Sequence, residues 1–316
     1  MTGIRLGTRK SRLAMWQTEH VASLLKQANP AVDVRIVPIV TLGDRVTDRP
    51  LYELGGTAVF TKEIEAALQN GECDIAVHSL KDLATVMPGG LQLAAYLPRE
   101  DPRDAFISKD GLSLADLPEG AVIGTSSLRR VAMIRHFRPD LQVVSLRGNV
   151  PTRLGAAGKE VPDAKPYSGP SLDGTIMAAA GLKRLGFHAH IQDYLPATRF
   201  MPAPGQGVIA LQTRCDDEKT NAIVEPLNCG RTRMAAVAER TFLNVVEGGC
   251  RLPIGAFSML TETTVELSGV ILSLDGKTKF TGAVEGKDPV EVGRQLAAEL
   301  LDAGGREILN GIKKNP

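Results

Sequence analysis

Hydroxyl and basic side chains occur together in three short segments, each at a predicted junction between a strand and a helix. The segments are GTRKS with Arg9, Lys10 and Ser11, HSLKD with Ser79 and Lys81, and GTSSLRR with Thr125, Ser126, Ser127, Arg129 and Arg130. The first turn of a helix offers unpaired N–H groups and a partial positive charge, so such side chains can hold a carboxylate or phosphate there. Because ligands of open parallel sheets bind at the carboxyl ends of strands, the segments predict one anion-binding site.

A fourth basic segment, SLRGNVPTRL, follows another predicted strand as an expected basic loop and adds Arg147, Asn149 and Arg153 to the site. A single arginine is most often a solvated surface charge, but repeated clusters of hydroxyl groups and arginines at strand ends favour binding. The whole chain is nearly neutral, with 37 Lys and Arg against 36 Asp and Glu. The cationic character is therefore local, and it predicts a polyanionic ligand.

Asp82 directly follows Lys81, at the end of the very apolar segment CDIAVHSL. A carboxylate with cationic neighbours in a partly dry setting suits a proton shuttle or the stabilisation of a cation. Aspartate is equally common as the N-cap of a helix at such a junction. From the residues alone, both interpretations of Asp82 stay open.

The four cysteines, Cys73, Cys215, Cys229 and Cys250, lie far apart without a CxxC pair or a zinc-ligand spacing, so no metal site is expected. A lone cysteine is most often a small buried apolar side chain. Cys250 has a different context, because EGGCRLPIG places it after two glycines and ahead of a proline. This segment is expected to be a loop that can face another domain.

The sequence argues against several classes of function. GQGVIA at residues 205–210 matches G-x-G-x-x-A but precedes a predicted strand rather than the helix of a dinucleotide site, and no P-loop motif occurs. The near-neutral charge and the lack of aromatic residues among the basic ones indicate no nucleic-acid partner. No apolar run reaches the ~18 residues that span a bilayer, and the N-terminal segment lacks the apolar core of a signal peptide. We therefore expect a cytoplasmic protein without a membrane partner, and a monomer.

Predicted strands alternate with predicted helices over most of the chain, which is typical of α/β domains with parallel sheets. We expect an α/β fold of two hinge-linked doubly wound domains resembling periplasmic binding proteins. A small α+β C-terminal domain, with a helix, three strands and a closing helix, is expected to follow. The predicted domains are residues 1–99 with 202–224, residues 100–201, and residues 225–316. Residues 156–174, rich in Gly, Pro and Ser, are expected to form a surface loop.

Eight segments, in order from about residue 4 to residue 255, carry a family resemblance. They are RxSxLAxWQ at residues 9–17, DIAVHSLKD at 74–82, EDPRDAF at 100–106, GTSSLRR, LRGNVxTRL, AGLKRLG, PGQG and EGGCxxPIG. Together they resemble the porphobilinogen deaminase family, also called hydroxymethylbilane synthases. The resemblance implies a transferase of tetrapyrrole biosynthesis that condenses four porphobilinogen molecules head to tail into hydroxymethylbilane and releases four ammonia.

The resemblance also implies the roles of individual residues. Cys250 would carry a dipyrromethane cofactor through a thioether, and the growing pyrrole chain would stay bound to it. Asp82 would be the catalytic aspartate, which stabilises the cationic azafulvene formed when ammonia leaves. The residues expected to bind the acetate and propionate groups of substrate and cofactor are Arg9, Ser11, Ser79, Lys81, Thr125, Ser126, Ser127, Arg129, Arg130, Arg147, Asn149, Arg153, Arg184 and Gln206.

Four positions depart from the family pattern. Glu53 and Thr57 stand in a loop where lysines are usual, Ala58 replaces a common glycine, and Ala84 replaces a frequent proline. None of these removes a residue of the expected mechanism, although they change the charge of the loop. An alternative class, a hinge-type anion-binding protein without catalysis, would share the α/β units but would need export, and Cys250 argues against it.

Overall fold

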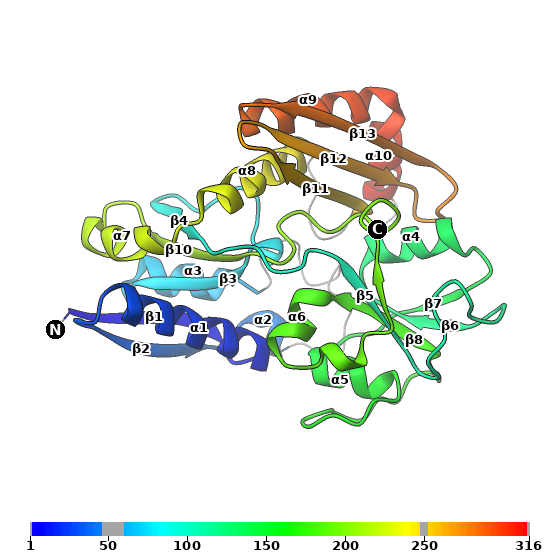
Figure 1. Ribbon diagram of the computed structural model, residues 1–316, viewed down its shortest axis with the longest axis horizontal. Coiled ribbons are helices and arrows are strands. Elements are labelled where there is room, and N and C mark those ends of the chain that lie inside the picture. The colour runs from blue at the N-terminus through cyan, green and yellow to red at the C-terminus, as the bar shows by residue number, and fades with distance from the viewer. Residues whose placement is uncertain (1, 46–59, 247–251, 315–316) are drawn as a thin grey trace.

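The computed structural model describes residues 2–45, 60–246 and 252–314, which form three β-sheets (Figure 1). Two five-stranded sheets have helices around them, and a three-stranded sheet lies beside them with helices α8 (Gly230–Val245) and α9 (Pro289–Leu300). Within these three ranges, no helix combines the length and the apolar character needed to cross a membrane.

The first sheet has the strand order β2-β1-β3-β10-β4. Its strands are β1 (Thr2–Arg9), β2 (Val32–Ile39), β3 (Ile75–Ser79), β4 (Leu91–Tyr96) and β10 (Ile209–Arg214). β1 is parallel to β2 and β3, whereas β10 is antiparallel to β3 and β4. The helices of this part are α1 (Arg12–Ala28), α2 (Leu42–Arg45), α3 (Lys62–Gln69) and α7 (Glu218–Val224).

The second sheet has the strand order β7-β6-β8-β5-β9. Its strands are β5 (Asp104–Ser108), β6 (Val122–Gly124), β7 (Gln142–Val144), β8 (Gly174–Ala178) and β9 (Asp193–Leu195). β6 is parallel to β7 and β8, whereas β5 is antiparallel to β8 and β9. The helices of this part are α4 (Leu128–Phe137), α5 (Val150–Ala156) and α6 (Ala179–Arg184).

The two larger sheets share one topology, in which three parallel strands are followed by an antiparallel strand and an edge strand. The antiparallel strand is β5 or β10, and each is the first strand after the chain passes from one sheet to the other. The strand expected after Pro202 thus returns to the first sheet. The expected α/β fold is confirmed, and both larger sheets are mixed rather than all parallel, because each passage between the sheets adds a strand that runs against the others.

The third sheet is an antiparallel meander of β11 (Ile254–Leu260), β12 (Val265–Leu272) and β13 (Lys279–Gly286). Phe242 of α8 and Leu296 of α9 pack on it in a shared apolar core with Leu267. This confirms the expected small α+β domain. A π-helical turn (Leu301–Gly305) and helix α10 (Arg306–Lys314), which the sequence analysis did not predict, follow α9.

Some local elements differ from the sequence-based expectations. The segment expected as a basic loop contains helix α5, which begins because Asn149 Oδ1 accepts a hydrogen bond from Thr152 N at 3.0 Å and Pro151 lies in the first turn. Residues 157–173 have no helix or strand, as expected for a surface loop. Strands β4, β5 and β9 and helices α2 and α7 were not predicted. Three short 3-10 turns complete the described elements: η2 (Leu80–Asp82), η3 (His188–His190) and η4 (Glu225–Leu227).

Candidate active site

Lys81 and Asp82 lie in turn η2, directly after strand β3 of the first sheet. The turn begins with Leu80, which is 1% exposed, so apolar packing fixes it at the carboxyl end of the strand. Lys81 Nζ donates a hydrogen bond to Gln206 Oε1 at 3.2 Å. Burial lowers the pKa of Lys81 to about 8, although the neighbouring Asp82 carboxylate opposes this shift.

Asp82 does not cap a helix. It is the last residue of η2, whose N-cap is Ser79, so the N-cap interpretation is wrong. The Asp82 carboxylate acts to raise the pKa of both Lys81 and Arg153. Since Arg153 belongs to α5 beside the second sheet, Asp82 faces cations from both sheets.

Arg129 and Arg130, in the first turn of α4, are 4% and 5% exposed. Both pair with the fully buried Asp104 at the start of β5: Arg129 Nη1 donates to Asp104 Oδ2 at 2.8 Å and Arg130 Nη2 donates to Asp104 Oδ1 at 2.7 Å. Arg130 Nη1 also donates to Ile176 O at 3.0 Å. Arg130 Nε is buried and has no hydrogen-bond partner among the described residues. A buried N–H group of this kind needs an acceptor, which a bound anion could supply.

Arg153 lies next to this pair and donates from Nε to Gly148 O at 2.9 Å. Burial, followed by the positive charges of Arg130 and Arg147, lowers the pKa of Arg153 to about 10. Arg130 and Arg129 likewise act to lower the pKa of Lys81. We call Lys81, Arg129, Arg130, Arg147 and Arg153 the cation cluster. Such a group of partly desolvated charges is unfavourable until anions neutralise it.

The hydroxyl groups of GTSS lie in the turn between β6 and α4. Ser126 Oγ donates to Leu146 O at 2.8 Å, and Thr125 Oγ1 accepts from Ser127 N at 3.3 Å. Ser127 occupies the N-cap position of α4, but its side chain makes no capping hydrogen bond there. The Ser127 hydroxyl is therefore next to the arginines and is not used to cap their helix.

Two predicted site residues at the end of β1 have partners within the protein. Arg9 forms an ion pair with Asp44, and its guanidinium group lies 4.0 Å from the centre of the Phe60 ring. Ser11 Oγ caps α1 by accepting from Ala14 N at 3.3 Å. The structure thus gives both side chains a local structural contact, and a role in binding stays a prediction for each.

Ser79 and Arg184 also have defined contacts. Ser79 Oγ accepts from Gln17 Nε2 at 2.9 Å, which ties the end of β3 to helix α1. Arg184 Nη2 donates to Gly207 O at 2.7 Å, in the segment that returns to the first sheet. Burial lowers the pKa of Arg184 to about 10. Arg184 is therefore a desolvated cation that lies beside the segment carrying Gln206.

The sequence analysis missed two buried carboxylates that organise this region. Asp104 belongs to the segment EDPRDAF, which was noted without a role. Glu239 of α8 is 0% exposed and accepts hydrogen bonds from Arg99 Nη1 at 2.6 Å and from Gly205 N at 2.7 Å. An acidic residue next to apolar neighbours, as in DAFI and VAER, was the available indication, since such a carboxylate needs partners when it is buried.

Cys250 lies outside the described residues, as do Glu53, Thr57 and Ala58. In the sequence, Cys250 falls between the end of α8 at Val245 and the start of β11 at Ile254. Ala84 is described, and its carbonyl oxygen accepts from Arg240 Nη2 of α8 at 2.6 Å. The helix that precedes Cys250 is thus linked to the segment that follows Asp82.

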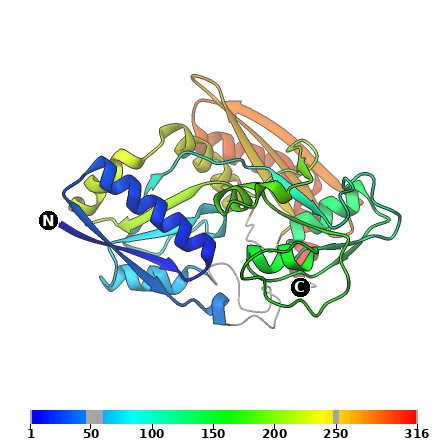
Figure 2. The ribbon, with the colours of Figure 1, turned by 60° about the horizontal axis from the view of Figure 1, so that its bottom comes forward.

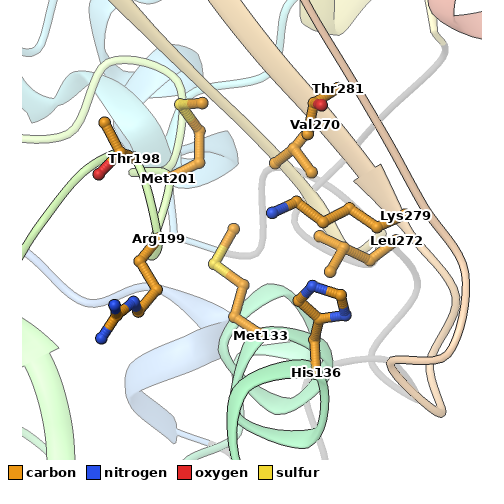
Figure 3. Close-up of a pocket in the computed structure, with 9 residues that line it drawn as sticks. All are labelled: Met133, His136, Thr198, Arg199, Met201, Val270, Leu272, Lys279 and Thr281. Carbon is orange, nitrogen blue, oxygen red and sulfur yellow. The ribbon is translucent and has the colours of Figure 1, made fainter.

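A small pocket lies between α4, residues 198–201 and strands β12 and β13 (Figure 3). Its walls include Met133 and Met201, and Arg129 Nη1 donates to Met201 O at 2.6 Å. The cavity volume is about 20 Å³, which is room for roughly one water molecule. This pocket is too small for a pyrrole, and it marks where the third sheet packs against α4.

Two protein-family models match the chain. The model of the "Porphobilinogen deaminase, dipyromethane cofactor binding domain" matches residues 4–222, and that of the "Porphobilinogen deaminase, C-terminal domain" matches residues 234–302. The porphobilinogen deaminase of Syntrophomonas wolfei is 46% identical over 316 residues, covering 99% of this chain and 100% of that protein. The porphobilinogen deaminase of Geotalea daltonii is 46% identical over 308 residues, covering 97% of this chain and 93% of that protein.

The methionine binding protein MetQ aligns with a TM-score of 0.41 and 14% identity over 71% of this chain and 89% of that chain, a score too low to bear on the fold. The two family models and the full-length relatives agree with each other and with the segments that surround the cation cluster. The chain belongs to the porphobilinogen deaminase family.

Proposed function

We propose that the protein converts four molecules of porphobilinogen into the linear tetrapyrrole hydroxymethylbilane, with release of four ammonia. The observation that carries this proposal is the convergence of Asp82 with the cation cluster. Each pyrrole of the substrate carries an acetate and a propionate, so a growing chain is a polyanion that suits a group of fixed cations. The membership of the chain in the porphobilinogen deaminase family supports the same reaction.

The residues present also fit a dipyrromethane cofactor, whose carboxylates need several donors. Arg130 offers a buried Nε group without a partner among the described residues, and Arg153 is a partly buried cation beside it. Ser127 adds a hydroxyl group at the start of α4, where the N–H groups of the first turn could also bind an anion. We propose that these three residues hold cofactor or substrate carboxylates, together with Lys81 and Arg147.

Asp82 supplies the charge that the reaction needs. When ammonia leaves porphobilinogen, positive charge develops on the pyrrole and its methylene carbon. A fixed carboxylate stabilises that charge more in the transition state than in the bound substrate, which is the condition for catalysis. The Asp82 carboxylate in turn favours the charged forms of Lys81 and Arg153, because it acts to raise the pKa of both.

Cys250 is the proposed point of cofactor attachment. The dipyrromethane group supplies the primer to which the first substrate is joined, and a thioether keeps the chain on the protein through all additions. Sulfur is a far better nucleophile than a serine hydroxyl near neutral pH, which explains a thiol at this position. The other three cysteines, Cys73, Cys215 and Cys229, are not part of this proposal.

We further propose the domain division predicted from the sequence, with the two α/β units joined at the passages between the sheets. The segment between β4 and β5 and the segment between β9 and β10 are these passages, and they are the natural hinges. A cytoplasmic location, a monomeric state and the absence of a nucleic-acid partner also stay proposals that rest on the sequence.

The experiment that tests the function is an intact-mass measurement before and after brief exposure to porphobilinogen. We expect the purified protein to exceed its sequence mass by one dipyrromethane and then to form a series of species spaced by single pyrrole units. Cys250→Ser should lose the adduct, whereas Cys215→Ser, at an exposed thiol, should keep it. A wild-type mass equal to the bare sequence, even after exposure, would favour the alternative of an anion-binding protein without catalysis.

A further inference from the structure

The carboxylate of Asp104 accepts hydrogen bonds from three residues in two different segments of the chain. It accepts hydrogen bonds from Arg129 and Arg130 of α4, at 2.8 Å and 2.7 Å, and from Gln206 Nε2 at 2.9 Å. Asp104 is 0% exposed, and β5 holds it between β8 and β9 in the second sheet. A buried carboxylate with this many charge-assisted partners is rigid, because each partner limits its rotation.

Gln206 extends this arrangement toward the first sheet. Its amide nitrogen donates to Asp104 Oδ1, and its amide oxygen accepts from Lys81 Nζ at 3.2 Å. Gln206 is itself 0% exposed, so the amide has a fixed orientation. It lies in the segment that passes back from the second sheet to the first, just before β10. One continuous path of hydrogen bonds therefore joins Asp104 on β5 to Lys81 after β3.

We propose that Asp104 is a positioning residue of the site: it fixes the guanidinium groups of Arg129 and Arg130 and, through Gln206, the ammonium group of Lys81. The role rests on the proposed function, because it is a role in holding the cations that bind pyrrole carboxylates. Asp104 itself does not touch the substrate. It sets the distance between cations that belong to different sheets.

The charges around Lys81 make this role measurable. The groups that act on Lys81 are Asp82 on its own turn, Arg129 and Arg130 on α4, and Asp104 on β5. Asp104 acts to raise the pKa of Lys81, and the two arginines act to lower it. Without the negative charge of Asp104, the lowering effect of Arg129 and Arg130 on the pKa of Lys81 would no longer be offset by this carboxylate. Lys81 would then lose its proton at lower pH.

The test is Asp104→Asn, which keeps the side-chain shape and removes the charge. The Lys81 titration is followed by NMR on protein with 13C-labelled lysines, with Lys81→Arg to assign the resonance. We expect the Lys81 midpoint to move about one pH unit toward acid, because one neighbouring negative charge is lost. We also expect kcat/KM for porphobilinogen to fall roughly fivefold at pH 8 and about twofold at pH 7, in step with the protonated fraction of Lys81.

The matched control is Asp101→Asn, in the same segment. Asp101 pairs with Arg103 at 2.7 Å and with Lys183 at 3.2 Å, so it is also an ion-paired carboxylate, but its partners lie outside the cation cluster. This variant should leave the Lys81 midpoint at its wild-type value. A shift of equal size in both variants would mean a general effect on the fold and would overturn the proposal.

A second variant keeps the proposal testable if Asp104→Asn does not fold. Gln206→Met cuts the path between Asp104 and Lys81 without changing any charge, and it removes an acceptor that favours the ammonium form. The Lys81 midpoint should again move toward acid. A folded Asp104→Asn protein, or failing that a folded Gln206→Met protein, with a wild-type Lys81 titration would overturn the proposal. If the wild-type protein forms no adduct with porphobilinogen, the proposed function fails, while the titration still decides the role of Asp104.

Discussion

Strand β3 has an aspartate near each end, and the two lie in opposite electrostatic settings. Asp74, just before the strand, accepts from Arg5 Nη2 at 2.7 Å and from Arg214 Nη2 at 3.4 Å. Burial alone would raise the pKa of Asp74, but the hydrogen bonds from Arg5 hold it below its usual value. Asp82, after the strand, lies beside cations whose own pKa values are lowered. At the Asp74 end of the strand, positive and negative charges are thus balanced within the protein. At the Asp82 end, positive charge exceeds negative charge, so an anionic ligand is needed there.

The largest expected effect comes from Asp82→Asn. The amide keeps the shape of the side chain but cannot stabilise positive charge on the reacting pyrrole, so we expect kcat to fall by about two orders of magnitude or more. The fold and the cofactor adduct should remain, as checked by circular dichroism and intact mass. Turnover close to that of the wild type would remove the functional difference between the two ends of the strand.

Arg130→Leu should have the next largest effect. The change removes a desolvated cation whose Nε group has no partner among the described residues, so we expect cofactor loading or chain extension to fall by about tenfold or more. Intact-mass spectra would show which step is lost. Arg138→Leu, at the other end of α4, removes the partner of Asp140 and is the matched control. Equal loading in both variants and the wild type would contradict a binding role for Arg130.

The pH dependence of kcat/KM should follow the loss of the proton from Lys81. Its pKa is lowered to about 8, so the ammonium group is present below this pH and is lost as the pH rises through it. We expect kcat/KM to fall on the alkaline side with a midpoint near pH 8, because a neutral amine no longer attracts carboxylates. Lys81→Arg should move the decline to higher pH, since a guanidinium group stays charged. A decline at the same pH in this variant would assign it to another group.

The smallest effect on activity is expected for Asp74→Asn. Loss of the pairs with Arg5 and Arg214 should reduce the free energy of unfolding by about 1 to 3 kcal/mol, measured by urea denaturation, with unchanged kcat/KM. The lowered pKa of Asp74 means that its contribution is present above the unfolded value and disappears as the pH falls through the folded value. A large loss of activity here would show that both ends of β3 serve the reaction.

Much of the site could be predicted because its residues follow strands in short, recognisable segments. The hydroxyl and basic residues of GTSSLRR and HSLKD do lie at the ends of β6 and β3. The alternation of residues along the chain also predicted the third sheet, in which alternate residues of β11 to β13 face one core. In these cases neighbouring residues determine the structure, so sequence spacing was sufficient.

The parts that were missed depend on contacts between distant residues. Asp104 looks like an ordinary strand residue until Arg129, Arg130 and Gln206 are brought to it, from 25, 26 and 102 positions away. The antiparallel strands β5 and β10 could not be assigned a direction from periodicity, because the direction follows from the route of the chain. Helix α5 is different, since Asn149 and Pro151 are a recognisable helix start that was overlooked.

The place of β10 in the first sheet has a consequence for synthesis of the chain. β10 lies between β3 and β4 and pairs with both, so β4 cannot join the sheet until residues 209–214 are present (Figures 1 and 2). All five strands of the second sheet have been made once the chain reaches Leu195. During translation, which proceeds from the N-terminus, the second sheet can therefore close first. The first sheet stays incomplete until this later strand is made: β3 is an open edge that a chaperone could cover, and β4 waits for its partner strand β10.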